Sequence, residues 1–201
     1  MTLPESYFDR VYDAARDPWS FETRWYERRK YALTIASLPK PRYLRCFEAG
    51  CSIGVLTSML APRCVSLLAA DITASSVVAT RQRLEGRPGV TVEQLTLPAD
   101  WPDGSFDLIV LSEIGYYLAK EDLDELVTRA TESLEAGGTL IAVHWRHGVA
   151  DYPLRGEDVH EVIEASPYLE RLARHDEEDF LLEVFARDRA VSVARATGLL
   201  T

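Results

Sequence analysis

The sequence has few cysteines and no long apolar run. Its three cysteines, Cys46, Cys51 and Cys64, contain no Cys-x-x-Cys pair and lie in apolar segments, which predicts free buried thiols rather than disulfides or a zinc site. No stretch approaches the roughly 20 apolar residues that span a bilayer, and acidic residues recur through the first thirty positions, unlike in a signal peptide. We therefore expect a cytoplasmic protein without a membrane segment or a metal.

Basic residues are scarce relative to acidic ones. The 201 residues include 22 Lys and Arg against 32 Asp and Glu, which gives a formal net charge of -10 at pH 7. Because phosphate binding needs clustered Lys and Arg, this balance argues against a nucleic acid or an anionic membrane as partner. The 47% of hydrophobic residues is enough to form the core of one compact domain, which excludes a disordered chain.

Helical patterns come first along the chain. Apolar residues from Phe8 to Ala15 have helical spacing and predict a helix over residues 5–15. A second helix is predicted over residues 21–38, where Pro39 ends it. Residues 1–40 are therefore expected to be helical.

From residue 41 onward, apolar runs of strand length alternate with helical patterns. The predicted strands are 43–47, 65–70, 90–95, 108–111 and 139–143, and the predicted helices are 55–60, 75–84 and 123–134. Such alternation, with strands that are apolar on both faces, predicts an α/β fold with a parallel sheet. Residues 168–174 and 180–187 differ, because the short polar loop between them permits only an antiparallel hairpin.

The most informative stretch joins a predicted strand to a predicted helix through a turn that contains Gly50 and Gly54. This arrangement directs backbone amides and a helix N-terminus toward a ligand outside the carboxyl end of the strand. Asp71 closes the next strand, where a carboxylate can accept hydrogen bonds from two ribose hydroxyls. Together these features predict a nucleoside cofactor.

The glycine loop distinguishes two kinds of cofactor. The dinucleotide fingerprint G-x-G-x-x-G falls on Gly50, Ser52 and Val55, so two glycines are missing, which disfavours a nicotinamide-dependent oxidoreductase. The loop instead resembles the E-x-G-x-G-x-G motif of class I S-adenosylmethionine-dependent methyltransferases. Glu48, Gly50 and Gly54 match that motif, and Ser52 replaces its middle glycine.

Two later segments extend this resemblance. Residues 102–110 and 135–140 resemble the segments that lead into the fourth and fifth strands of those methyltransferases. The resemblance implies a Rossmann-like, seven-stranded, mostly parallel sheet with helices on both faces and an antiparallel last strand. It also implies S-adenosyl-L-methionine as cofactor, with S-adenosyl-L-homocysteine as product.

A narrower resemblance is to the nodulation protein S group of methyltransferases. It is carried by Asp17-Pro18-Trp19, Trp25-Tyr26-Glu27, Lys30-Tyr31, Ser112 to Tyr117, His144-Trp145 and Asp151 to Leu154. That group is associated with N-methylation of a glucosamine amine at the end of a deacetylated chitooligosaccharide. The resemblance implies an amine or amino-sugar acceptor, with residues 1–40 as a lid over the cofactor and residues 41–201 as the methyltransferase domain. O-methylation of a small metabolite and a non-catalytic binder remain alternatives.

The resemblance also assigns residues to the cofactor site. They are Trp19, Lys30, Glu48, Gly50, Cys51, Gly54, Asp71, Ile72, Thr96, Leu97, Trp101 and Ser112. In this assignment Asp71 binds the ribose, the backbone of Thr96 and Leu97 holds the adenine, and Trp101 is an apolar wall or a core residue. Lys30 either pairs with the methionyl carboxylate or is a solvated cation.

Glu113, His144 and Tyr117 are the candidate catalytic residues. Glu113 and His144 end the fourth and fifth strands, on the side where ligands bind in open α/β sheets. Glu113 would hold an ammonium group, His144 would accept its proton, and Tyr117 with Tyr116 would form a wall against a sugar. The alternative for His144 is a hydrogen-bonded structural imidazole.

Overall fold

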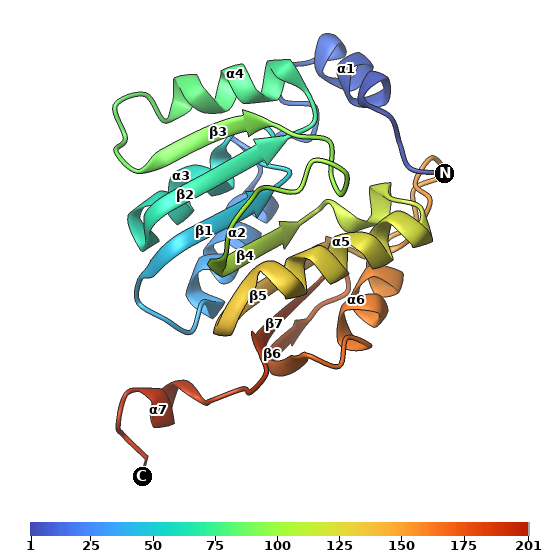
Figure 1. Cartoon of the computed structure of the whole chain (residues 1–201). Coiled ribbons are helices and arrows are strands. Elements are labelled where there is room, and N and C mark those ends of the chain that lie inside the picture. Colours follow the sequence, from blue (N-terminus) through green and yellow to red (C-terminus); the bar gives the residue numbers. More distant parts are fainter. Residues whose placement is uncertain (201) are drawn as a thin grey trace.

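The structure of the protein is a computed structural model that describes residues 1–200. Its centre is a seven-stranded sheet in the order β3-β2-β1-β4-β5-β7-β6, with helices on both faces (Figure 1). The strands are β1 (Tyr43–Ala49), β2 (Cys64–Asp71), β3 (Val90–Gln94), β4 (Phe106–Ser112), β5 (Leu134–Trp145), β6 (Leu169–Asp176) and β7 (Phe180–Arg187).

Helices precede, connect and follow these strands. They are α1 (Glu5–Ala14), α2 (Trp25–Ser37), α3 (Val55–Leu60), α4 (Ala74–Arg83), α5 (Lys120–Ser133), α6 (Gly156–Glu164) and α7 (Val193–Ala196), with short 3-10 turns η1 (Ala61–Arg63) and η2 (Gly115–Tyr117). Within the described residues, no helix is long and apolar enough to cross a membrane.

The strand directions confirm the predicted topology. β3, β2, β1, β4 and β5 pair in parallel, whereas β7 is antiparallel to both β5 and β6. The β6–β7 pair is the predicted hairpin. The sheet is therefore mostly parallel, and its last strand in sequence is antiparallel.

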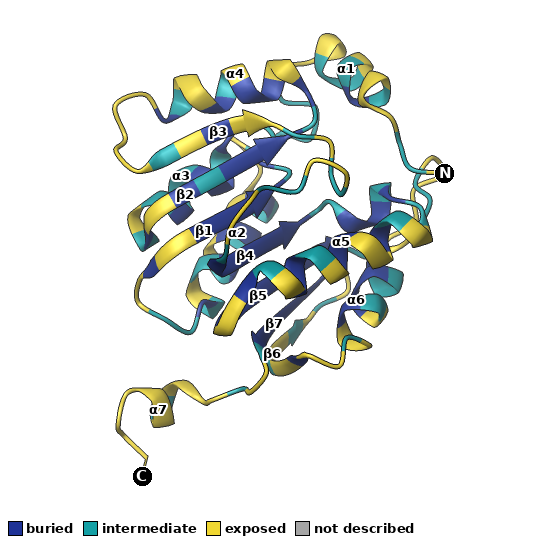
Figure 2. Cartoon of the chain, viewed as in Figure 1, coloured by how far each residue is buried: buried dark blue, intermediate teal, exposed yellow. Residues whose placement is uncertain are grey.

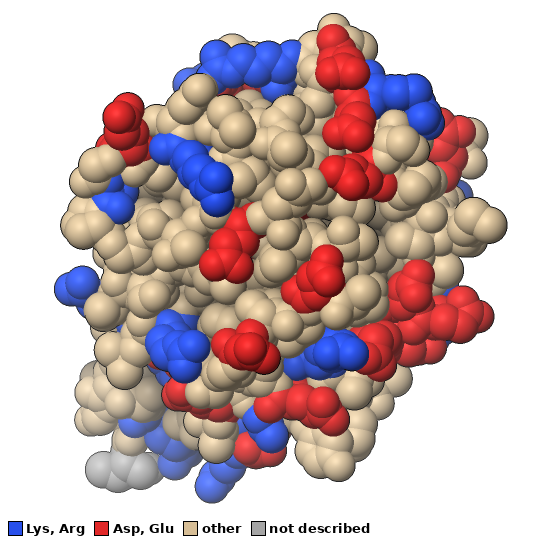
Figure 3. Space-filling view, turned by 45° about the horizontal axis from the view of Figure 1, so that its top comes forward, with Lys and Arg blue, Asp and Glu red and all other residues tan. Residues whose placement is uncertain are grey.

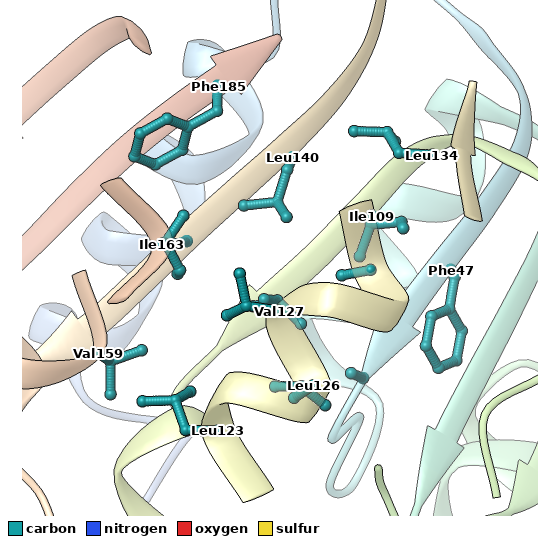
Figure 4. Packing of buried hydrophobic residues seen from close by; sticks show 14 of the residues in the cluster. Phe47, Ile109, Leu123, Leu126, Val127, Leu134, Leu140, Val159, Ile163 and Phe185 are labelled. Carbon is teal, nitrogen blue, oxygen red and sulfur yellow. The ribbon is translucent and has the colours of Figure 1, made fainter. Parts of the chain in front are cut away.

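The core lies on both faces of the sheet, because side chains of β4 alternate between them. Ile109 and Leu111 face one layer, in which α5 contributes Leu123, Leu126 and Val127 at helical spacing (Figure 4). Leu108 and Val110 belong to the opposite layer, where Tyr31 and Leu38 from the α2 region and Leu56 and Leu60 from α3 pack. Figure 2 shows that the central strands are buried along most of their length.

The structure refines several sequence predictions. Residues 21–24 are not part of α2, which begins at Trp25, and α6 has no counterpart among the predicted elements although Val159 and Ile163 form a buried i, i+4 pair. Within residues 1–40, α2 packs on the sheet and contributes Tyr31 to the cavity described below, whereas the segment before α2 contributes most of the other lining residues from this region. The three cysteines are free and buried, as predicted.

Candidate functional site

A cavity of about 360 Å³ opens at the carboxyl ends of β1, β2 and β4. Glu48, Asp71 and Ser112 reach it from these strand ends, and Leu3 and Phe8 close it from the amino-terminal segment. Open parallel sheets bind ligands at such strand ends. This cavity is the candidate site.

Most of the predicted site residues line this cavity. They are Trp19, Glu48, Gly50, Cys51, Asp71, Ile72, Thr96, Leu97, Ser112, Glu113 and Tyr117. Lys30, Gly54, Trp101 and His144 do not belong to its lining. Residues that the sequence did not indicate also contribute, including Leu3, Glu5, Phe8 and Tyr12.

The glycine loop has the backbone that its sequence requires. Gly50 and Gly54 have φ angles of 75° and 78°, and a Cβ atom on Gly54 would lie 2.9 Å from the Thr80 side chain. Ser52 has a φ of 50°, so a non-glycine residue occupies a left-handed conformation here. Its hydroxyl lies 2.6 Å from the hydroxyl of Tyr12 in α1, which links the loop to the cavity cover.

Asp71 faces the cavity from the end of β2. Its carboxylate accepts hydrogen bonds from the backbone amides of Ser52 and Thr73, at 2.8 and 3.0 Å. Burial raises the pKa of Asp71, and these hydrogen bonds, which lower it, offset the rise only in part. The Thr73 hydroxyl is a third donor to Asp71, at 3.2 Å, so about one of the four acceptor positions of the carboxylate remains for a ligand.

Glu48 carries the clearest unmet hydrogen-bonding capacity in the lining. It is only 2% exposed, and its buried Oε2 has no hydrogen-bond partner within the part of the chain that the structure describes. Burial raises the pKa of Glu48 to about 8. A cationic group in the cavity would supply the missing partner and favour the ionised form.

Glu113 lines the cavity and is held there by three donors. Its Oε1 accepts from Lys30 Nζ at 2.5 Å, and its Oε2 accepts from the backbone amide of Trp145 at 2.9 Å and from the Tyr116 hydroxyl. The residue also has a φ of 58°, a strained conformation for a side chain of this type. The structure thus fixes the direction of the Glu113 carboxylate.

Lys30 corrects both sequence interpretations. It is 2% exposed rather than solvated, and its Nζ lies between the carboxylates of Glu113 and Glu27, at 2.5 and 3.0 Å. Burial lowers its pKa, but the two carboxylates outweigh this and raise it. The charge of Lys30 is therefore used inside the protein rather than directed at the methionyl carboxylate of a cofactor.

His144 is fully buried behind the lining and does not reach the cavity. Its Nε2 accepts the backbone N–H of Gly115 at 3.2 Å, and its Nδ1 lies 3.2 Å from Nε2 of His160. Burial lowers its pKa well below the usual range, with further lowering from His160 and Lys30. Both ring nitrogens of His144 are engaged within the protein. His144 is therefore a structural imidazole, and its predicted role as a proton acceptor is wrong.

Of the residues predicted to surround the adenine, two line the cavity and one does not. Thr96 and Leu97 line the cavity, and the Thr96 backbone is engaged with Asp100 through hydrogen bonds in both directions. Trp101 instead packs edge to face on Phe47, with ring centroids 5.1 Å apart, and donates to the Ser133 hydroxyl at 3.1 Å. Trp101 is therefore a core residue, as its alternative interpretation held.

Aromatic rings form the wall next to Glu113. Tyr117 contacts Phe8, Tyr116 and Tyr152 edge to face, with ring centroids 4.7 to 4.9 Å apart. Burial raises the pKa of Tyr117 well above its usual range, so its hydroxyl stays protonated. The wall can pack against an apolar or sugar face and donate a hydrogen bond.

The amino-terminal segment is attached on both sides of the cavity. The Leu3 amide donates to the Tyr117 carbonyl at 2.9 Å, and Gln94 donates to Glu5 at 2.8 Å. Together with the contact of Tyr12 and Ser52, these bonds hold residues 2–12 across the opening. No motif signals this covering, because it arises from hydrogen bonds between residues far apart in sequence.

Acidic side chains are prominent in the lining of the cavity. Its lining includes Glu5, Glu48, Asp71 and Glu113 but no Lys, Arg or His among the described residues. Figure 3 shows acidic side chains gathered over the region of α1 on the neighbouring surface. The site therefore favours a cationic ligand.

Comparison with known proteins identifies the family. The family model of nodulation protein S (NodS) matches residues 8–152, well over half of the chain. The chain belongs to the nodulation protein S family. Curated family members include nodulation protein S from Rhizobium tropici, which is 30% identical over 132 residues, or 64% of this chain and 55% of that protein. The protein from Sinorhizobium fredii is 30% identical over 106 residues, or 52% of this chain and 49% of that protein, so the chain spans about half the length of these relatives.

Solved structures agree with the fold. A putative methyltransferase from Pseudomonas syringae is 44% identical, with a TM-score of 0.73, and the match covers 82% of this chain and all of that one. The N-methyltransferase NodS from Bradyrhizobium japonicum WM9, in complex with S-adenosyl-L-homocysteine, is 23% identical with a TM-score of 0.83, covering 92% and 98% of the two chains. The Rossmann-like methyltransferase fold expected from the sequence is thereby confirmed.

Proposed function

We propose that this protein is an S-adenosylmethionine-dependent methyltransferase that acts on an amine. The observation that carries the proposal is the acidic lining of the cavity, which has four carboxyl side chains and no basic residue among those described. A sulfonium cofactor is cationic, and an amine acceptor is mostly cationic when it arrives. Both therefore match the field of the site.

The β1–β2 side fits the cofactor. Asp71 retains about one acceptor position for a ribose hydroxyl, and the buried Oε2 of Glu48 lacks a partner that the amino group would provide. Gly50 allows the loop to pass close to a ligand, and Leu97 lines the predicted adenine region. When bound, S-adenosylmethionine supplies a methyl group that is bonded to a sulfonium sulfur. This sulfur is a good leaving group.

The β4–β5 side fits the amine. Three donors use three of the roughly four acceptor positions of the Glu113 carboxylate, which leaves one for an N–H of the acceptor. Tyr117 lies on the same lining and limits the directions in which that group can enter. Glu113 and Tyr117 thus orient the nitrogen, and the amino-terminal cover keeps water out.

A dedicated base is not essential for this reaction. An amine with a pKa near the α-amino reference of about 7.7 to 8.0 is roughly one tenth neutral at pH 7, which costs only about 1 kcal/mol. This agrees with a cavity in which His144 is absent from the lining. Positioning of the neutral amine is then the main contribution of the protein.

Among amines, we propose a terminal glucosamine of a deacetylated chitooligosaccharide as the acceptor. The support is membership of the nodulation protein S family and a related solved structure that is described as an N-methyltransferase. Tyr117 and Tyr152 offer rings and hydroxyls of the kind that bind sugars. O-methylation of a small metabolite is the alternative that the test must separate.

The test combines binding with transfer. We expect S-adenosylhomocysteine to bind the purified protein in calorimetry, and methyl groups to transfer to deacetylated chitooligosaccharides and glucosamine. Fully acetylated oligosaccharides, which retain the hydroxyls but lack the free amine, are the matched controls and should stay unmethylated. No binding at millimolar S-adenosylhomocysteine would reject the cofactor, whereas methylation of the acetylated controls would reject the amine.

A further inference from the structure

A buried chain of hydrogen-bonded side chains leads away from the Glu113 loop to β7, the strand next to the β6 edge of the sheet. It begins at the Gly115 amide, passes through His144 and His160, and ends at Glu183. Successive distances are 3.2 Å, 3.2 Å and 2.7 Å, and the three side chains are each at most 3% exposed. None of them lines the cavity.

The proton positions in this chain follow from its first member. A backbone N–H is always a donor, so the Gly115 amide makes His144 Nε2 an acceptor and places the His144 proton on Nδ1. His144 Nδ1–H then donates to His160 Nε2, and His160 Nδ1–H donates to the Glu183 carboxylate. Each imidazole is neutral and in one tautomer, which its neighbours select.

The far end of the chain is fixed by charge. Glu183 Oε2 faces His160, while Oε1 faces Arg171 and Arg174 at 3.0 and 3.5 Å. Burial opposes ionisation of Glu183, but the hydrogen bond from His160 and the charges of Arg174 and Arg171 lower its pKa overall. The carboxylate is thus an acceptor on both of its sides.

The near end of the chain holds the cavity wall. Gly115 begins η2, between Glu113 and Tyr117, and a Cβ atom at this position would lie 2.4 Å from the Val159 side chain of α6. The loop therefore has little freedom on that side, and its amide is directed at His144. The direction of Gly115 sets the path of the backbone that carries both Glu113 and Tyr117.

We propose that Glu183, His160 and His144 are positioning residues that hold the Glu113–Tyr117 loop in its acceptor-binding conformation through a fixed pair of histidine tautomers. The kinetic part of this proposal rests on the proposed function, whereas the tautomers and the loop conformation do not. These three residues act on the acceptor only through the loop, because their side chains do not touch the cavity. Hydrogen-bonded networks of this kind are fully satisfied only in one protonation pattern.

Glu183→Gln tests the chain at the end remote from the cavity. In the variant, the amide oxygen faces the arginines and the NH₂ group faces His160, so His160 Nδ1 becomes an acceptor. The His160 proton moves to its Nε2, which then donates to His144 Nδ1. The His144 proton therefore moves to its own Nε2, where this N–H and the Gly115 N–H oppose each other. Glu164→Gln is the matched control, because Glu164 also pairs with Arg171, at 2.6 Å, but lies outside the chain.

Histidine side-chain ¹⁵N spectra read the tautomers directly. We expect Nδ1–H on both His144 and His160 in the wild-type protein and in Glu164→Gln, and Nε2–H on both in Glu183→Gln, together with a shifted Gly115 amide resonance. Methyl transfer by Glu183→Gln should lose about tenfold or more in kcat/KM for the acceptor, while affinity for S-adenosylhomocysteine stays within about twofold.

Two results would overturn the proposal. One is an Nε2–H tautomer on either histidine in the wild-type protein, which needs no variant to measure. The other is a Glu183→Gln protein whose Gly115 resonance and acceptor kinetics match those of Glu164→Gln. The Gly115 resonance is measurable even in a protein that transfers no methyl group, so failure of the proposed function is distinguishable from failure of this inference.

Discussion

The two halves of the cavity are built in different ways. On the β1–β2 side, the loop around Gly50 is shaped by backbone conformation, and Asp71 accepts from backbone amides. On the β4–β5 side, Glu113 is held mainly by side chains, through Lys30 and Tyr116, and its loop rests on a chain of buried histidines. The first half leaves its carboxylates available to a ligand, whereas the second half uses its charges largely within the protein.

This difference separates what each half contributes. Substitutions on the β1–β2 side should change ligand affinity above all, because Asp71 is held by backbone amides and a hydroxyl rather than by a buried cation. Substitutions on the β4–β5 side should change stability as well, because each group there satisfies a buried partner. The following experiments, from the largest expected effect to the smallest, test this contrast.

Loss of Lys30 should have the largest effect. Lys30→Met removes the cation that lies between Glu113 and Glu27 and leaves two buried carboxylates facing each other. We expect a loss of about 3 to 5 kcal/mol in the free energy of unfolding, measured by urea denaturation. Lys120→Met is the control, because Lys120 pairs with Asp124 on the surface of α5 and should cost about 0.5 kcal/mol or less. Equal losses in the two variants would contradict the buried ion cluster.

Asp71→Ala should act on binding. Ribose hydroxyls would lose their charged acceptor, and we expect affinity for S-adenosylhomocysteine to fall by about 1 to 3 kcal/mol in calorimetry. Glu113→Gln, on the other half, should leave that affinity nearly unchanged and lower methyl transfer instead. If the two variants weakened S-adenosylhomocysteine binding equally, the division of the cavity into two halves would be wrong.

Glu48 should make cofactor binding depend on pH. Its pKa of about 8 means that Glu48 is protonated below pH 8 in the free protein, and a cationic ligand stabilises the ionised form. Binding of S-adenosylmethionine should therefore release a proton, and affinity should rise with pH, by at most about tenfold per unit, until it levels off near pH 8. Calorimetry in two buffers of different ionisation enthalpy measures the released proton. Glu48→Gln should release none from this position, and an unchanged proton count would exclude Glu48.

The same group links pH to stability. The pKa of Glu48 is higher in the folded protein than in the unfolded chain. The contribution of Glu48 to the free energy of unfolding is therefore fully present below the unfolded pKa and is lost as pH rises through about 8. The Glu48→Gln protein should therefore gain thermal stability over the wild type as pH increases from 5 to 8. A constant difference in Tm across this range would show that Glu48 does not titrate in it.

The contrast also explains which parts of the site the sequence revealed. The glycine loop and Asp71 were predictable because local backbone requirements leave a motif, and the strands followed from apolar runs. The role of Lys30 was not predictable, since Glu113 lies far away in sequence and only the fold brings the two together. His144 was placed correctly at the end of its strand, but its partner His160 lies on α6, a helix that the sequence analysis did not anticipate.

The smallest expected effect concerns the contact between the glycine loop and the amino-terminal cover of the cavity. Tyr12 donates to or accepts from Ser52, which replaces the middle glycine of the motif, so the substitution in the loop is matched by a hydroxyl in α1. We expect Tyr12→Phe to weaken S-adenosylhomocysteine binding by about 0.5 to 1.5 kcal/mol. Ser52→Gly removes the same bond but relieves a left-handed φ, so its own effect should be smaller. In a double-mutant cycle the two changes should couple by about 1 kcal/mol, and strictly additive effects would show that the hydroxyl contact does not hold the cover in place.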